Sequence, residues 1–348
     1  MNRSDPQADA ASSSRARRVA GAIVKWGLLA AVLVFVGRAL YYDFRKVEWS
    51  EIRFDGALMA LAVASVAAAR AIVFLPYAIL IGRFLPPPQR RCRCGGRVGH
   101  RPPWPGMIGA VWVSQAARYV PGKVSSVVSM ALALRRYGVP DQVAVSTLVI
   151  VDGLSVVIGM LVAIPITLWE PVRQFLPMAW LWCAVGMAAA LVCLHPRVFG
   201  AVGNFLLVRI GYQPFASLPR LRDYVRPALA LALTYVLFGV GYWLMARSLG
   251  AEAAPADLPL FICAVTVVLI GGFLAFFAPA GLGVQEGLLL LVLGPMIGAG
   301  PAAIIAVLMR LLQTVTEAGL GAVGLALLRQ GPKTAEAAAP PSENGGNP

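Results

Sequence analysis

Ionisable side chains inside apolar stretches are the residues of this sequence with the clearest chemistry. In the apolar run from Pro301 to Leu328, Arg310, Gln313 and Glu317 follow one another at spacings of three and four residues. On a helix, this spacing puts all three on one face. An ionised side chain in a bilayer costs at least about 2.5 kcal/mol, so it usually pairs, faces the bundle interior or marks a pathway.

Arg70 and Asp152 are two more ionisable residues within apolar runs. Two interpretations of Arg70, Asp152, Arg310 and Glu317 stay open. They either form interhelical ion pairs that hold a bundle together, for example Asp152 with Arg70 or Arg310, or they line a polar track for a lipid headgroup. In such a track, arginines would hold phosphate, and carboxylates would relay protons or balance charge.

A Pro-Gly pair interrupts the moderately apolar segment Met107 to Leu134, where the sequence reads RYVPGK from Arg118 to Lys123. Proline lacks a backbone N–H and disfavours a helical conformation of the preceding residue, so a helix must stop or bend near Tyr119. Backbone freed at membrane depth is tolerated only where protein buries it or where it lines a water-filled cavity. Pro121 and Gly122 therefore mark a candidate site.

The other half of the sequence holds a similar interruption, FFAPAGLGVQEG, in which Pro279, Gly281 and Gly283 precede Glu286. Interrupted segments at corresponding places in two halves are typical of transporter binding sites. The N–H groups of the helices that begin after the breaks suit an anion such as phosphate, and Arg118 and Lys123 add positive charge at the first break. Glu286 either caps its helix or is a counter-ion to a cation. Alternatively, the two motifs are only a kinked helix and a loop between spans.

The composition places these residues in a membrane protein. Of 348 residues, 59% are hydrophobic and 13% are charged, whereas about 25% of a soluble domain is charged. The net charge of +14 is spread between apolar runs, so we expect no nucleic-acid partner. We predict an all-α, polytopic integral membrane helical bundle of about eight spans plus a re-entrant hairpin, with a possible inverted repeat.

The spans follow from runs of about 20 apolar residues, which cross about 30 Å of hydrocarbon. They are Ala20 to Leu40, Gly56 to Ile81, Gln142 to Trp169, Phe175 to His195, Ala228 to Ala246, Leu258 to Phe277, Gly287 to Ala299 and Pro301 to Leu328. Met107 to Leu134 is the predicted hairpin. The transmembrane domain would cover residues 20–330, between disordered tails at 1–19 and 331–348. The distribution of Lys and Arg between loops predicts a cytoplasmic (inner) membrane protein with both termini cytosolic.

The sequence indicates neither an enzyme nor a cofactor. It contains no Walker loop, zinc-site helix or nucleophile elbow, and only a short tail follows Arg329. The acidic residues within the spans are too scattered to propose a catalytic pair. Cys92 and Cys94, in RCRCGG, have His100 downstream but lack a second pair of metal ligands. We therefore interpret them as reduced thiols of a cytosolic loop.

Three motifs carry a family resemblance: RYVPGK at Arg118 to Lys123, RRYGVP at Arg135 to Pro140 and APAGLGVQEG at Ala278 to Gly287. In this order, the chain resembles the flippase-like family related to the transmembrane region of lysylphosphatidylglycerol synthase, over residues 20–330. The resemblance implies a bundle that moves lipids or lipid-linked saccharides between leaflets, often beside glycosyltransferases or lipid-modifying enzymes. The cytosolic domain that attaches the amino acid in full-length synthases is absent, so synthase activity is not expected.

The two motifs around the breaks imply the site residues of the family. These are Arg118, Tyr119, Pro121, Gly122, Pro279, Gly281, Gly283 and Glu286. The sequence departs from the family at three places. Ala280 stands where the second motif commonly has Gly, Gln285 stands where it commonly has Arg, and Asp152 lies near a place where many members carry Glu. The missing arginine removes an expected phosphate contact.

Two hypotheses of function follow. The one we favour is a membrane translocase for a phospholipid or lipid-linked saccharide, with a central polar site built by the two broken segments. The alternative is a non-transporting membrane partner that anchors or regulates a glycosyltransferase or lipid-modifying enzyme. The first predicts that function depends on Arg118 and Glu286, and the second that it depends on the basic loop from Arg90 to Arg101.

Overall fold

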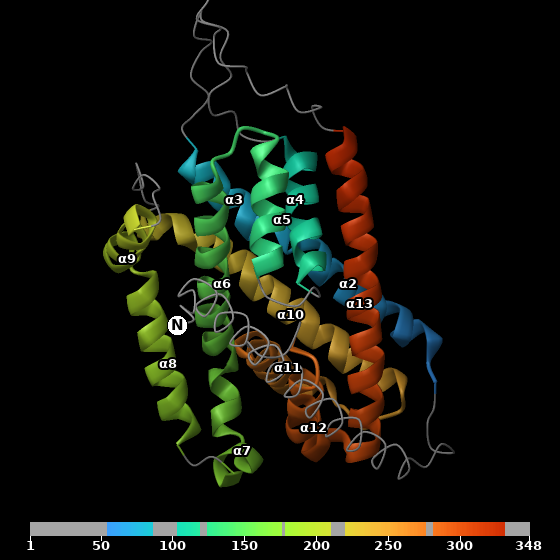
Figure 1. The fold of residues 1–348 in the computed structure, drawn as a ribbon. Coiled ribbons are helices and arrows are strands. Elements are labelled where there is room, and N and C mark those ends of the chain that lie inside the picture. Colours follow the sequence, from blue (N-terminus) through green and yellow to red (C-terminus); the bar gives the residue numbers. More distant parts are fainter. Residues whose placement is uncertain are drawn as a thin grey trace, which may run out of the picture.

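The structure is a computed structural model, and it describes residues 54–85, 103–118, 124–175, 178–209, 220–275 and 281–330. Within these ranges the chain is all helical, without a strand (Figure 1). The predicted first span Ala20 to Leu40, both predicted tails, and Cys92, Cys94 and His100 lie outside the described residues.

Apart from a helix at Pro196–Arg209, which lies between two predicted spans, the described helices fall within or beside the predicted apolar runs, in order. They are α2 (Gly56–Ile72), α3 (Phe74–Phe84), α4 (Trp104–Ala117), α5 (Val124–Arg135), α6 (Asp141–Ala163), α7 (Glu170–Phe175), α8 (Ala179–Leu194), α9 (Pro196–Arg209), α10 (Val225–Ser248), α11 (Leu258–Leu274), α12 (Val284–Ile297) and α13 (Ala299–Gln330). Short 3-10 helices occupy Ile164–Leu168, Leu221–Tyr224 and Pro255–Asp257.

Five stretches of the described residues are long and apolar enough to cross a membrane. They are Gly56–Phe84, Asp141–Leu168, Leu221–Ser248, Pro255–Leu274 and Ala299–Gln330. The predicted all-α membrane bundle is therefore confirmed. The predicted number of spans is not, because α8 and α12 have only 16 and 14 residues, fewer than the roughly 20 that a spanning helix needs.

The predicted span Gly56 to Ile81 is interrupted in its middle. Asp55 caps its start, where the side-chain Oδ1 accepts the N–H groups of Ala57 and Leu58 at 2.9 and 3.1 Å. Helix α2 ends at Ile72, and α3 begins after Val73. Pro76 lies in the first turn of α3 and has no N–H to give to the preceding turn, which explains why the helix is interrupted here.

Helix α13 is the long helix on which α4 and α12 pack. Its 32 residues make it about 48 Å long, and it runs the full height of the bundle (Figure 1). Helix α4 packs on the half that ends at Gln330, because Gly109 of α4 lies against Gly324 and Leu328. Helix α12 packs on the half that begins at Ala299.

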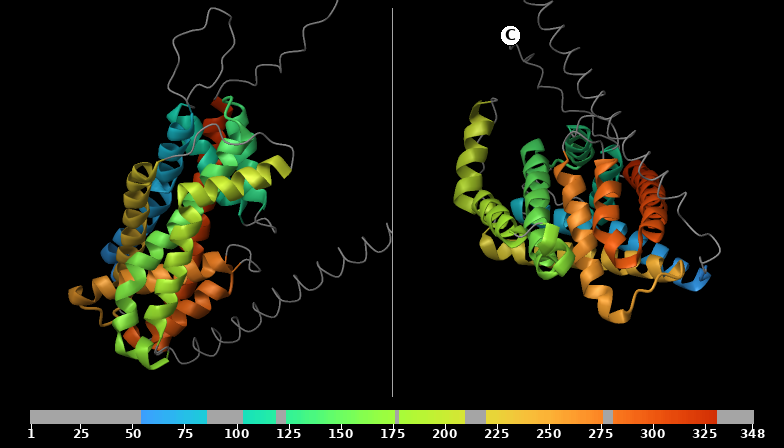
Figure 2. Two further views of the ribbon diagram at one scale, coloured as in Figure 1. Left: turned by 90° about the vertical axis from the view of Figure 1, so that its left-hand side faces the viewer. Right: turned by 90° about the horizontal axis from the view of Figure 1, so that it is seen from below.

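Two antiparallel helix pairs approach the middle of α13 from opposite ends of the bundle. Helices α4 and α5 form one pair and α11 and α12 the other, as Figure 1 and the left view of Figure 2 show. Residues 119–123 and 276–280, which include Pro121, Gly122 and Pro279, lie outside the described residues. Gly281 and Gly283 have φ angles of +71° and +84°, a left-handed conformation that glycine adopts without strain.

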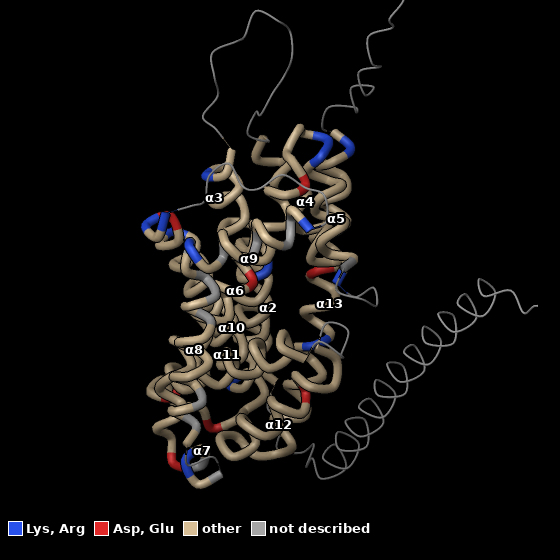
Figure 3. The backbone as a smooth tube through the Cα atoms, turned by 60° about the vertical axis from the view of Figure 1, so that its left-hand side comes forward, with Lys and Arg blue, Asp and Glu red and all other residues tan. Residues whose placement is uncertain are grey.

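Buried apolar side chains form two clusters, one among α2 and α10–α13 and the other mainly among α3–α6. The outer surface is also apolar, for example at Trp180, Leu229 and Leu311, as expected for helices that face lipid. Most charged residues lie at the two ends of the bundle (Figure 3). The end where α13 finishes carries the basic residues Arg83, Arg135, Arg136, Arg220, Arg222 and Arg329.

Candidate functional site

A buried carboxylate in the middle of α13 holds two arginines from different helices. Nη1 of Arg70, from α2, lies 2.9 Å from Oε1 of Glu317, and Arg118, directly after α4, forms an ion pair with the same oxygen. The side chains of Glu317, Arg70 and Arg118 are 2%, 10% and 29% exposed. Charges this deeply buried are stable only when they are paired and hydrogen-bonded.

Arg70 is fixed from two further directions. Its Nη2 donates to Oε1 of Gln313 at 2.5 Å, and its guanidinium lies 4.7 Å from the ring centroid of Phe238. Gln313 in turn donates through Nε2 to the hydroxyl of Tyr242 at 2.8 Å. This arrangement leaves Arg70 little freedom, because a hydrogen bond, an ion pair and a cation–π contact all orient the same planar group.

Glu286, at the start of α12, has both of the roles that the sequence left open. Its Oε2 accepts the backbone N–H of Gly283 at 2.7 Å, and its Oε1 lies 3.5 Å from Nε of Arg310. Arg310 also donates through Nη1 to Oε1 of Gln285 at 3.1 Å. The start of α12 thus uses its own carboxylate as a cap and links that cap to α13.

A branch of neutral side chains connects Asp152 to Arg118. The hydroxyl of Tyr77 donates to Oδ1 of Asp152 at 3.1 Å and accepts from Nε2 of Gln115 at 3.3 Å. The side-chain oxygen of Gln115 accepts from Nη1 of Arg118 at 3.4 Å. Asp152 of α6 therefore belongs to the same network, whereas the ion-pair partners of Arg70 and Arg310 are Glu317 and Glu286.

The network lies at the middle of the hydrophobic stretches. Arg310 and Glu317 bracket the centre of Ala299–Gln330, and their separation of seven residues corresponds to about 10 Å along the helix. Arg70 and Asp152 lie near the centres of the spanning stretches Gly56–Phe84 and Asp141–Leu168. Three arginines and three carboxylates therefore meet at mid-height, far from the charged ends (Figure 3).

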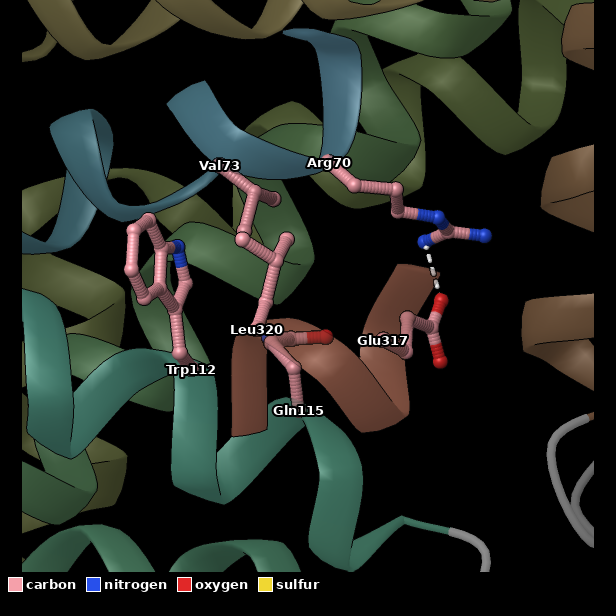
Figure 4. A pocket seen from close by; sticks show the side chains of 6 residues that line it. All are labelled: Arg70, Val73, Trp112, Gln115, Glu317 and Leu320. Atoms are coloured by element: carbon pink, nitrogen blue, oxygen red, sulfur yellow. Dashed lines mark ion pairs between the residues drawn. The ribbon is translucent and has the colours of Figure 1, made fainter. Parts of the chain in front are cut away.

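Two small cavities border the network. One is lined by Arg70, Val73, Trp112, Gln115, Glu317 and Leu320, and Figure 4 shows Arg70 and Glu317 pointing toward each other beside the α4 side chains. The other is lined by Tyr242, Gln285, Glu286, Leu289, Ala306, Arg310 and Gln313. Each has space for about one water molecule, so a headgroup can reach the network only if side chains or helices separate.

The structure brings together many of the residues that the sequence singled out. Arg70, Arg118 and Glu317 form one group, Arg310 and Glu286 form another, and Asp152 joins through Tyr77. Gly281 and Gly283 lie in the turn before α12. The predicted site residues Tyr119, Pro121, Gly122, Lys123 and Pro279 lie outside the described residues.

Apart from Gln313, sequence reasoning missed the neutral members of the network. Tyr77, Tyr242 and Phe238 look like ordinary core residues of apolar helices, and no spacing distinguishes them. Gln115 could have been found, because it precedes Arg118 by three residues and therefore shares its helix face. The break between α2 and α3, close to Arg70, could also have been predicted, because Pro76 follows it by a few residues.

The fold and the buried charges together define a multi-pass integral membrane protein with a polar site inside its helical bundle. Residues 23–321 match the family described as the lysylphosphatidylglycerol synthase TM region. Because the match covers most of the chain, the protein belongs to this family, as the three motifs predicted. No curated protein sequence matches the chain.

Proposed function

We propose that this protein is a translocase that carries a phospholipid or a lipid-linked saccharide across the cytoplasmic membrane. The observation that supports this function is the group of three arginines and three carboxylates buried at mid-height. Ionised groups at this depth are costly, and in membrane proteins they commonly line substrate or ion pathways. Membership of a lipid-related family is consistent with a lipid as the cargo.

The arginines favour a cargo that contains phosphate. A guanidinium presents its donors in a planar fork that matches phosphate oxygens. Arg118 is the most exposed of the three arginines that pair with buried carboxylates, at 29% against 10% for Arg70 and 14% for Arg310. We assign the first contact with a headgroup to Arg118, while the acyl or prenyl chains remain in the lipid.

The topology that fits this role contains two re-entrant helix pairs. Helices α4, α5 and α12, with 14, 12 and 14 residues, are too short to cross about 30 Å of hydrocarbon. In this proposal α4–α5 enters from one leaflet and α11–α12 from the other, as an inverted repeat would. The arginine-rich end of the bundle faces the cytosol, which is the side that short basic loops prefer.

Leaflet exchange in liposomes tests the function. Purified protein is reconstituted, and transfer of fluorescent phosphatidylglycerol, phosphatidylethanolamine or a lipid-linked saccharide is compared with transfer in empty vesicles. We expect faster exchange of at least one class, and we expect Arg118→Ala to lose most of it. The control is Arg329→Ala, an exposed arginine of the last turn of α13, which should transport normally.

Two results would contradict the proposal. Exchange no faster than in empty vesicles, for every lipid class, would remove the transport function and favour the alternative of a non-transporting partner of a glycosyltransferase or lipid-modifying enzyme. Equal loss in Arg118→Ala and Arg329→Ala would show that transport does not depend on the buried network.

A further inference from the structure

Glu317 makes incomplete use of its hydrogen-bonding capacity. Arg70 and Arg118 both pair with its Oε1. Its Oε2 is buried and accepts no hydrogen bond from the described residues. Glu317 also lines the small cavity beside Gln115 and Trp112 (Figure 4). A buried oxygen without a donor costs free energy, so two guanidinium groups here share an anion that fits them poorly.

A phosphate group would satisfy the same two arginines better. It offers several strong acceptor oxygens, whereas both arginines converge on one oxygen of Glu317. The two guanidinium groups come from different elements, α2 and the end of α4, and both reach the same point on α13. Two arginines converging from separate elements form a site for an oxyanion, and in this structure the oxyanion is the protein's own carboxylate.

The two arginines differ in how readily they can change partner. Arg70 is also bound by Gln313 and Phe238. Arg118 follows the last residue of α4, is more exposed, and has among its contacts a 3.4 Å hydrogen bond to Gln115. An incoming anion would therefore meet Arg118 first, and Arg70 would remain the fixed half of the site.

We propose that Glu317 is an exchangeable internal ligand, which occupies in the closed state the arginine site that a phosphate group takes during transport. The phosphate displaces the carboxylate from Arg118 and then from Arg70, and Glu317 returns when the phosphate leaves. This proposal rests on the proposed function for its role in transport. The exchange itself can be tested without any transport.

Binding of inorganic phosphate to the purified protein in neutral detergent is the first test. Glu317→Gln removes the competing charge and keeps the shape of the side chain. We expect it to bind phosphate about tenfold more tightly than the unmodified protein, because a charge-assisted hydrogen bond no longer has to be broken. Adding Arg118→Ala to Glu317→Gln should abolish this gain.

Asp141→Asn is the matched control, because Asp141 is also a carboxylate that pairs with an arginine, Arg135, but it lies at the start of α6, outside the buried network. It should leave phosphate affinity unchanged, since its ion pair lies at the end of the bundle and shares no residue with the buried network. Thermal unfolding is measured for every variant. If Glu317→Gln does not fold, Glu317→Asp replaces it. This variant keeps the charge but withdraws it from the arginines, and it should show a smaller gain.

Vesicles identify the source of the phosphate. Protein in phosphatidylcholine vesicles is compared with protein in vesicles that also contain phosphatidylglycerol. At high salt, which screens the repulsion of phosphate by the anionic surface, weaker binding of free phosphate in the second case identifies a lipid headgroup as the ligand, and unchanged binding identifies a soluble phosphate ester. In the leaflet-exchange assay, Glu317→Gln should slow transfer, because the carboxylate that displaces bound phosphate is missing.

The proposal has outcomes that overturn it. A folded Glu317→Gln protein that binds phosphate no more tightly than the unmodified chain would show that Glu317 only ties helices together. An equal gain in Asp141→Asn would show a general effect of charge. A protein that moves no lipid but shows the gain at Glu317 would refute the transport function and leave the exchange intact.

Discussion

The link between α12 and α13 offers the sharpest test of how the network stabilises the fold. Glu286 both caps α12 at Gly283 and pairs with Arg310. Glu286→Ala removes both contacts, whereas Glu286→Gln keeps an acceptor for the Gly283 N–H and removes only the charge. The two variants therefore separate the cap from the ion pair.

The magnitudes follow from the geometry. Loss of a helix cap costs about 1 kcal/mol, and removal of one partner of a buried ion pair costs about 3–5 kcal/mol. The Glu286–Arg310 distance of 3.5 Å is long and Arg310 keeps its bond to Gln285, so we take about 3 kcal/mol for the charge. We expect Glu286→Gln to lose about 3 kcal/mol and Glu286→Ala about 4 kcal/mol.

Equilibrium unfolding in mixed micelles with a rising fraction of sodium dodecyl sulfate, followed by circular dichroism, measures these losses. Arg310→Gln and the double variant Glu286→Gln/Arg310→Gln complete a thermodynamic cycle. Because the two residues are in contact, the double variant should be more stable than the sum of the single losses predicts, by about 2 kcal/mol. Losses that add to within about 0.5 kcal/mol would refute the ion pair as a stabilising contact.

Two further variants test local features of the fold by the same unfolding measurement. Gly281→Ala should destabilise by more than about 1 kcal/mol, because φ is +71° and the new Cβ would lie 2.8 Å from the Gly272 carbonyl oxygen. Gly287→Ala, in α12 with nothing within 4 Å, should be neutral or stabilising, and equal effects at the two sites would contradict the backbone argument. Tyr77→Phe should cost about 1–3 kcal/mol, because Asp152 and Gln115 each lose a hydrogen bond. The matched control is Tyr224→Phe, whose buried hydroxyl has no partner among the described residues; a smaller loss for Tyr77→Phe than for this control would contradict the assignment.

The sequence was sufficient to predict the features that depend on local pattern. Apolar runs predicted the spanning helices to within a few residues, because burial in lipid requires length and hydropathy more than any particular packing. Helical spacing also placed Arg310, Gln313 and Glu317 on one face, and all three contribute side chains to the network.

The partners of these residues could not be predicted, because a pair depends on how helices far apart in sequence pack together. Arg70 and Glu317 are 247 residues apart in a chain of 348, and the sequence gives no register between their helices. The sequence suggested Arg70 or Arg310 as the partner of Asp152. In the structure, Arg70 pairs with Glu317 of α13, and Arg310 pairs with Glu286 of α12. The predicted span Leu258 to Phe277 corresponds to Pro255–Leu274, which is long enough to cross a membrane. The predicted span Gly287 to Ala299 corresponds to the 14-residue α12, whose Glu286 meets α13 at its middle.

One mechanical consequence follows because the helix pairs α4–α5 and α11–α12 both attach to α13. The ion pair of Arg118 and the ion pair of Arg310 act on the same face of one rigid rod, two turns apart. If that rod pivots about its midpoint, its two halves swing in opposite directions, so a movement toward one hairpin is a movement away from the other. Such a pivot would link the movement of α4, which packs on one half of α13, to that of α12, which packs on the other half.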